Sequence, residues 1–290
     1  MLASIVASAR RSGYIVWYLP DGDRLRKNGY FITPNAQREG MFDLQNLSQE
    51  ACSQFLLSHE DDLQGFEADK ETMELYFKES QLQEMENYSG EGIALVDLLK
   101  HAAEVKSNAP MCYSVVVDRL MNQEDKPFLM VLDDFNCYYD KGHYYHMAWD
   151  EDVRDPIPCE RITLFEHALG VMGLSTSDDD DPKIAKHIKR GGIVVGVTES
   201  HAVARRITDS LTASAKRQST KDGAPTDLHI VEVPRFSDIE ADHILANFEA
   251  TGVGKLRMDR GETLMDEQEV AYLKMVSGCI GQNLLDSSIL

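Results

Sequence analysis

Short continuous runs of apolar residues recur along this chain of 290 residues, and longer polar or helix-like stretches separate them. The runs are residues 14–19 (YIVWYL), 128–132 (FLMVL), 192–197 (GIVVGV) and 228–233 (LHIVEV). Each is short, rich in β-branched or aromatic residues, and bounded by a proline, a glycine or an acidic residue, as buried strands are. Strands that are apolar throughout predict a parallel α/β sheet with helices on both faces.

Helical spacing of apolar residues indicates the helices that would cover this sheet. The clearest start signal is a capping box, in which Ser237 would cap a helix and Glu240 would return a hydrogen bond from the third helical position. The segments expected to be helical are residues 1–12, 162–174, 238–248 and 266–278.

The remaining segments are polar. Residues 47–106 look helical throughout and strongly acidic, with eleven acidic residues from Glu60 to Glu91 against Lys70 and Lys78. Such charge is typical of a solvated helix face, and a docking surface for a basic partner is the alternative. Polar turns or loops are expected at residues 21–27, 175–181 and 213–227.

These patterns predict two parts. Residues 1–233 would form an α/β core that carries the acidic helical insertion at about 47–106, and residues 234–290 would form a helical C-terminal lid.

The net charge of −20, from 49 acidic and 29 basic residues, narrows the choice of partners. Proteins that bind nucleic acid on their own are usually basic, so the charge favours protein contacts as the dominant interaction. No apolar stretch approaches the 18 residues of a membrane span. The five cysteines include no C-x-x-C pair, which favours buried thiols in a reducing compartment over a zinc or disulfide framework.

A hydrophobic strand that ends in two acids, FLMVLDD, has the form of a Walker B segment. It would deliver Asp133 to the carboxyl edge of the sheet, where Asp133 could hold a magnesium-bound water and Asp134 could polarise an attacking water. Thr198 follows the next strand at the same edge and could sense a phosphate. The alternative is that Asp133 and Asp134 are turn or capping residues and that Thr198 belongs to a polar transition from strand to loop.

Other catalytic signatures are absent from the sequence. No G-x-x-x-x-G-K-[ST] phosphate loop occurs, so the 290 residues alone should bind nucleotide weakly. No G-x-S-x-G nucleophile elbow is present. His143 and His146 have a spacing that metal ligands can use, but two tyrosines separate them in an expected loop, and we expect no metal site.

Several segments together resemble one family, the mitochondrial small-subunit ribosomal proteins known as death-associated protein 3. ASARRSGYIVWYLP is similar to the segment after that family's phosphate loop, and FLMVLDDFNCYY to its Walker B strand. PNAQREGMFDLQNLSQEACSQFL and VEVPRFSDIEADHILANFEATGVG resemble two of its helix entries. The family's late S-G-G-N-P turn appears here only as SGCIG, at residues 277–281.

The resemblance implies a structural, non-catalytic protein in the head of the mitochondrial small ribosomal subunit, located in the matrix. Its partners would be ribosomal proteins and ribosomal RNA, with no membrane and no DNA. No cofactor is certain; GTP or GDP with Mg²⁺ would bind at Asp133, Asp134 and Thr198 only if a phosphate loop were supplied from elsewhere. The alternative is a fragment of a signal-transducing phosphate-loop ATPase or GTPase switch.

Basic islands in the sequence are the candidates for contact with RNA phosphates, and ordinary surface charge is the alternative explanation. The candidates are Arg24, Arg26, Lys27, Lys186, Lys189 and Arg190.

The resemblance also implies a phosphate-loop NTPase-like sheet that lacks one strand. Such sheets usually have the strand order 5-1-4-3-2, in which the four runs would be strands two to five. The first strand would then lie between residues 192–197 and 228–233, and upstream residues or another polypeptide would supply it. Residues 1–12 would be the helix whose N-terminus normally faces the phosphates. Residues 1–20 also have the composition of a presequence, but we favour the core helix because a strand follows directly.

Overall fold

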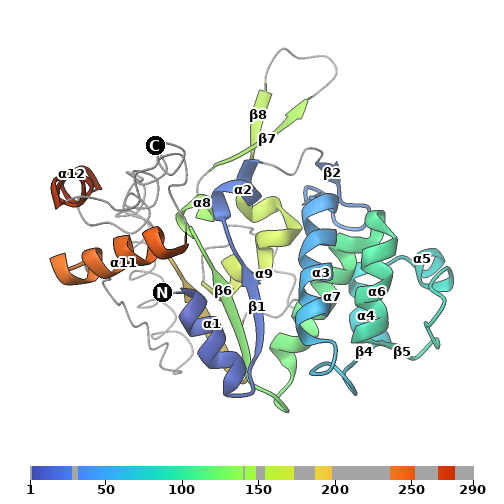
Figure 1. The fold of residues 1–290 in the computed structure, drawn as a ribbon. Coiled ribbons are helices and arrows are strands. Elements are labelled where there is room, and N and C mark those ends of the chain that lie inside the picture. The colour runs from blue at the N-terminus through green and yellow to red at the C-terminus, as the bar shows by residue number, and fades with distance from the viewer. Residues whose placement is uncertain are drawn as a thin grey trace, which may run out of the picture. The chain divides into compact units, whose positions relative to one another are not determined.

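The computed structural model describes most of the chain. The described residues are 2–27, 32–139, 141–147, 154–172, 187–197, 236–251 and 267–277. The chain forms two compact units, residues 1–228 and 229–290 (Figure 1). Of the residues described, no helix is both long enough and apolar enough to cross a lipid bilayer.

The centre of the first unit is a parallel sheet of three strands. Its strands are β1 (Ile15–Leu19), β6 (Phe128–Leu132) and β9 (Gly191–Val195), in the order β1-β6-β9 (Figure 1). Ile15 is opposite Phe128 in the register, and Phe128 is opposite Gly191. The predicted α/β class with parallel strands is therefore confirmed, whereas the predicted strand 228–233 lies outside the described residues.

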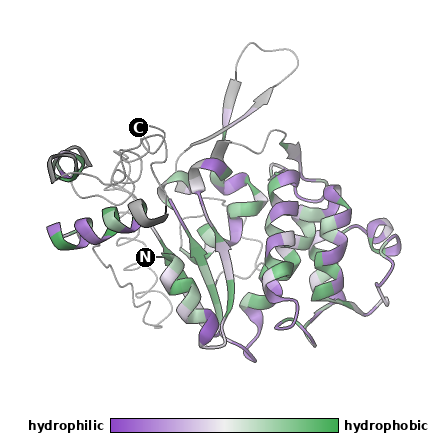
Figure 2. Cartoon of the chain, viewed as in Figure 1, coloured by the Kyte–Doolittle hydropathy of each residue, from purple (hydrophilic) through white to green (hydrophobic). Residues whose placement is uncertain are grey.

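One face of this sheet is covered by helix α1 (Leu2–Arg11), which the sequence predicted. Its apolar residues recur at helical spacing and therefore lie on one side, toward the strands. Figure 2 shows apolar residues along β6 and along much of α1. This small core consists of Leu2, Val16, Leu129 and Val131, with Ile5, Val6, Ala9 and Val194 packed against it.

The other face carries the main core. It is covered by helices α3 (Gln45–His59), α7 (Ala109–Asn122) and α9 (Thr163–Val171), and α6 (Leu95–Glu104) packs against α3 and α7 (Figure 1). Trp17 of β1 is fully buried there, with its ring 4.1 Å from that of Phe55 and 4.9 Å from that of Tyr113 in an edge-on contact. These aromatic contacts join the sheet to α3 and α7.

Shorter elements connect and flank the layers. They are α2 (Gly22–Lys27), β2 (Thr33–Pro34), β3 (Phe42–Asp43), β4 (Glu67–Asp69), α4 (Lys70–Tyr76), α5 (Glu79–Gln83), β5 (Gly92–Ala94), the 3-10 helix Lys106–Asn108, α8 (Asn136–Tyr139), β7 (Lys141–Met147), β8 (Arg154–Pro158) and the 3-10 helix Cys159–Arg161. Three antiparallel pairs form among them: β2 with β3, β4 with β5, and β7 with β8.

Three expectations about these elements were wrong. The segment 47–106 is not helical throughout, because the β4–β5 pair interrupts it. Most of the expected turn 21–27 is a short helix, Gly22–Lys27, in which Leu25 is buried. The sequence HYYH lies in strand β7, where pairing with β8 leaves Tyr144 buried and Tyr145 exposed.

The described cysteines of the first unit are buried and form no disulfide bond with one another. They are Cys52, Cys112, Cys137 and Cys159. The expectation of buried thiols is thus confirmed for these four residues, and Cys279 lies outside the described residues.

The second unit contains α11 (Asp238–Thr251) and α12 (Glu267–Ser277). Ala241, Leu245 and Leu273 form the buried contact between these two helices. The predicted capping box is confirmed: the Ser237 amide donates to a Glu240 carboxylate oxygen at 2.8 Å, and the Glu240 amide donates to the Ser237 hydroxyl at 3.3 Å.

Candidate functional site

Backbone hydrogen bonds bring the carboxyl ends of the three parallel strands together. The Asp133 amide donates to the Leu19 carbonyl at 3.0 Å, which ties the end of β6 to the end of β1. The Gly196 amide donates to the Leu132 carbonyl at 2.8 Å, and the Phe135 amide to the Gly196 carbonyl at 2.7 Å. Asp133 therefore stands at the carboxyl edge, where open α/β sheets bind ligands.

The start of helix α1 lies at the same edge. A Cβ atom placed on Gly196 would lie 2.8 Å from Leu2 Cδ1 and 3.0 Å from Asp133 Oδ1. Leu2 and Asp133 thus flank the same glycine, although they are far apart in the sequence. A helix N-terminus attracts anions, and a carboxylate attracts cations, so the pair has the polarity that a phosphate with a bound metal ion would need.

Asp133 is held in place by its neighbour. Its Oδ1 accepts a hydrogen bond from the Asp134 amide at 3.0 Å, and Asp134 itself has a left-handed backbone with φ of 49°. Burial raises the pKa of Asp133, the hydrogen bond from the Asp134 amide lowers it, and the charges of Asp134 and Asp21 raise it again. The net upward shift means that the ionised carboxylate is disfavoured here, and a bound cation would relieve that cost.

Helix α2 is packed against this acidic turn. A Cβ atom on Gly22 would lie 2.7 Å from the Asp134 carbonyl oxygen and 2.8 Å from that of Asp133, so only glycine fits there. Burial, followed by the charges of Asp133 and Asp134, raises the pKa of Tyr18 at the end of β1. Gly22 was missed by the sequence reasoning, and its proximity to the acids could not be read from a local pattern.

The other predicted site residues are distributed over several places. Thr198 lies outside the described residues, and so do Lys186 and the side chains of Arg26 and Lys27. Arg24 on α2 pairs with both carboxylate oxygens of Glu50, at 2.9 and 2.7 Å.

The two predicted residues that precede β9 differ in their contacts. Lys189 is exposed. Arg190 donates through one guanidinium nitrogen to the carbonyls of Glu124 and Asp125, at 2.9 and 3.0 Å.

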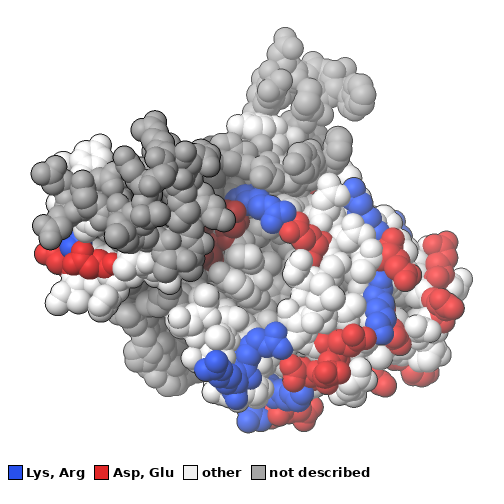
Figure 3. Space-filling view, viewed as in Figure 1, with Lys and Arg blue, Asp and Glu red and all other residues white. Residues whose placement is uncertain are grey.

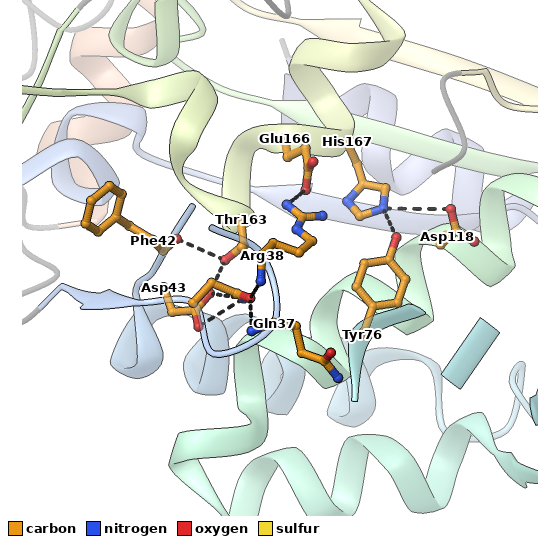
Figure 4. A network of polar contacts seen from close by, with 10 residues as sticks. Gln37, Arg38, Phe42, Asp43, Tyr76, Asp118, Thr163, Glu166 and His167 are labelled. Carbon is orange, nitrogen blue, oxygen red and sulfur yellow. Dashed lines mark hydrogen bonds and ion pairs between the residues drawn. The ribbon is translucent and has the colours of Figure 1, made fainter. Parts of the chain in front are cut away.

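A second polar cluster lies inside the main core, beside helix α9 (Figure 4). Asp43 is only 5% exposed, and its carboxylate accepts hydrogen bonds from the Thr163 hydroxyl at 2.9 Å and the Asn35 amide nitrogen at 3.1 Å. Burial raises the pKa of Asp43, while these two donors and Arg38 partly offset the shift. These contacts attach β3 to the first turn of α9.

His167 lies on one side of this cluster, next to Tyr76 and Asp118 (Figure 4). It is fully buried, with Nε2 at 3.4 Å from the Tyr76 hydroxyl and 3.9 Å from an Asp118 carboxylate oxygen. Next to it, Arg38 and Glu166 form an ion pair of 2.6 Å. Burial and, to a smaller extent, the Arg38 charge lower the pKa of His167 to about 3, so the imidazole is neutral near pH 7.

The second cluster is best explained as internal bracing, because its contacts join β3, α4, α7 and α9. No group of three or more His, Cys, Asp or Glu side chains among the described residues is arranged to hold a metal ion. The carboxyl edge with Asp133 is therefore the candidate functional site.

The low pKa of His167 predicts a loss of stability in mild acid. His167 binds a proton with the ordinary pKa of 6.5 in the unfolded chain but only near pH 3 in the folded chain. Protonation therefore favours the unfolded chain, so the stability from neutral His167 is fully present above pH 6.5 and is lost as the pH falls toward 3. Between pH 7 and pH 5.5, the free energy of unfolding should fall by about 1 kcal/mol more in the wild-type chain than in His167→Asn. Urea unfolding at both pH values measures this, and His187→Asn, at an exposed position, should behave like the wild type. Equal losses in all three proteins would contradict the assignment.

The close approach of α2 to the acidic turn predicts opposite effects for two glycine substitutions. Gly22→Ala should lower the free energy of unfolding by about 1–3 kcal/mol, because its methyl group meets two backbone oxygens that cannot move independently. Gly170→Ala, in helix α9 with open space around its Cβ position, should raise it by up to about 1 kcal/mol. Urea denaturation checks both. A Gly22→Ala protein as stable as the wild type would show that α2 does not pack against the backbone of Asp133 and Asp134.

Comparison with known protein families identifies the family of this chain. The family profile described as "Mitochondrial ribosomal death-associated protein 3" matches residues 1–272, which is most of the chain. No curated protein matches the chain. Because the match covers 272 of the 290 residues, including the parallel sheet and the acidic edge, the chain belongs to the mitochondrial ribosomal death-associated protein 3 family.

Proposed function

We propose that the chain is a structural, non-catalytic constituent of the mitochondrial small ribosomal subunit, located in its head. Membership of the family carries the proposal: it makes the chain a mitochondrial ribosomal protein of the matrix, with ribosomal proteins and ribosomal RNA as its class of partner. The position in the head, the non-catalytic role and any bound nucleotide go beyond the family match.

The lack of a phosphate loop in the 290 residues supports the non-catalytic role. In phosphate-loop enzymes, phosphoryl transfer depends on a loop whose backbone N–H groups and lysine hold the β- and γ-phosphates. The sequence contains no G-x-x-x-x-G-K-[ST] motif that would form such a loop. Asp133 alone can contact a metal ion but cannot position a phosphate for attack. We therefore assign the carboxyl edge the role of a conditional guanine-nucleotide scaffold, which needs a phosphate loop from residues beyond these 290.

The strand order is compatible with this view. In a 5-1-4-3-2 sheet, β1, β6 and β9 would be strands two, three and four, and the missing central strand would pair with the outer edge of β9. Within the described residues, β9 has only β6 as a strand partner. An unpaired central edge would leave backbone groups without hydrogen bonds, at a cost of about 1–3 kcal/mol for each buried group. A strand from elsewhere is thus part of the proposal, as is the role of a lid for residues 234–290, which include α11 and α12.

The second candidate is a switch protein of the signal-transducing phosphate-loop class. The observation that favours it is the placement of Asp133 and Asp134 at the carboxyl edge beside the start of α1. The two candidates predict different behaviour in cell extracts.

Sedimentation separates the two candidates. A structural constituent should migrate with small ribosomal subunits through a sucrose gradient at about 0.5 M salt, because its contacts are extensive and only partly ionic. A switch protein should remain in the light fractions under the same conditions. Mitochondrial extracts that contain the tagged full-length protein provide the measurement. Complete recovery in the light fractions would refute the structural role.

Asp133 offers a test of the nucleotide scaffold. Because burial and neighbouring acids raise its pKa, its negative charge opposes folding, whereas an asparagine would keep an oxygen that can accept from the Asp134 amide. In the full-length protein, Asp133→Asn should therefore raise the thermal midpoint without nucleotide and abolish any further increase caused by Mg²⁺ and GDP. Asp61→Asn, at an exposed position, is the control and should change neither value. If Mg²⁺ and GDP stabilise Asp133→Asn as much as the wild type, the scaffold does not use Asp133.

A further inference from the structure

The amino ends of the parallel strands also meet, at the edge opposite Asp133. The Ile15 amide donates to the Pro127 carbonyl at 2.9 Å, and the Phe128 amide donates to the Arg190 carbonyl at 2.9 Å. The segments that lead into β1, β6 and β9 are thus bonded side by side. Neighbouring strands lie about 4.8 Å apart, so side chains from these segments share one surface.

Each of these three segments carries basic side chains. We call this surface the basic amino edge, and it consists of Arg10, Arg11, Lys126, Lys189 and Arg190. Figure 3 shows lysine and arginine gathered at the lower end of the view, where α1 ends, with acidic residues beside them. The residues come from three separate stretches of sequence, so only the parallel topology unites them.

Some of these cations have fixed intramolecular partners. Asp62, at the end of the α3 region, lies 3.9 Å from an Arg10 nitrogen and 3.5 Å from Lys126 Nζ. Arg190 is held by the carbonyls of Glu124 and Asp125. These contacts fix the positions of the cations without neutralising all of them, because Arg190 contacts backbone oxygens rather than carboxylates.

Arg11 and Lys189 are different. Both side chains are exposed, and neither forms a hydrogen bond or an ion pair with another described residue. Their charges are therefore available to an external anion.

The net charge of the whole chain makes this local surface informative. At −20, the chain as a whole is repelled by a polyanion, so contact with nucleic acid requires a local basic surface. The other basic candidate surface, around Arg24, is partly neutralised by the two-oxygen ion pair with Glu50. The basic amino edge is thus the better-placed surface for an anionic partner.

We propose that the basic amino edge binds the phosphate backbone of ribosomal RNA. The inference rests on the proposed ribosomal function, which supplies RNA as the polyanion. Clustered lysine and arginine side chains from adjacent strand entries suit phosphate oxygens, and such contacts position a protein without reading base sequence. The opposite edge, with Asp133 and Asp134, then faces away from the RNA.

Binding to purified mitochondrial small-subunit ribosomal RNA tests the proposal with the full-length protein. Arg11→Ala/Lys189→Ala should weaken binding several-fold at 100 mM salt and make the slope of log affinity against log salt shallower by about 1–2. Lys70→Ala/Lys78→Ala removes the same number of charges from exposed positions on the acidic segment and is the matched control. Circular dichroism and urea midpoints should be unchanged in both variants. An amino-edge variant that binds like the control would overturn the proposal.

Crosslinking in assembled small subunits separates this proposal from the proposed function. Ultraviolet irradiation followed by mass spectrometry should find nucleotide adducts on the peptides that contain Arg11, Lys126 or Lys189. If the protein co-sediments with the subunit but these peptides crosslink only to acidic proteins, the RNA surface is wrong and the ribosomal role stands. If the wild-type protein never co-sediments, the ribosomal role itself fails.

Discussion

The parallel pairing of β1, β6 and β9 is the interaction on which the rest of this structure depends. Parallel strands send all their carboxyl ends to one edge and all their amino ends to the other, so short segments far apart in sequence become neighbours. At one edge this creates an acidic turn beside the start of α1. At the other it unites basic residues that precede three different strands. The two edges differ in charge because the strand direction separates the two sets of connecting segments.

The three parallel strands β1, β6 and β9 could be predicted from the sequence, because burial on both faces of the sheet leaves a continuous run of apolar residues. FLMVL at β6 is the clearest case, since every one of its residues is buried. Helix α7 gave no comparable signal, because it is buried nearly all round and therefore lacks the polar face that reveals a helix. The β4–β5 pair was hidden for another reason: its strands are three residues long and lie in a highly acidic segment, so neither shows enough alternation to be recognised.

The candidate site also includes residues that could be predicted from the sequence and residues that could not. Asp133 could be located from its own strand, because the end of a buried strand fixes where the next residue must lie. Gly22 and His167 could not, because their roles depend on contacts across long sequence separations, such as that of His167 with Tyr76, 91 residues away. Membership of the family supports the ribosomal role, whereas the chemistry of the edges has to be read from the fold.

The buried thiols have a consequence for a protein of the mitochondrial matrix. Burial raises the pKa of Cys52 and Cys112 far above the ordinary value, so the reactive thiolate form is nearly absent while the core is closed. Peroxide and alkylating agents therefore have little to attack in the folded chain. Oxidative damage at these positions would begin only after the helical layer had separated from the sheet, which makes the core its own protection against redox stress.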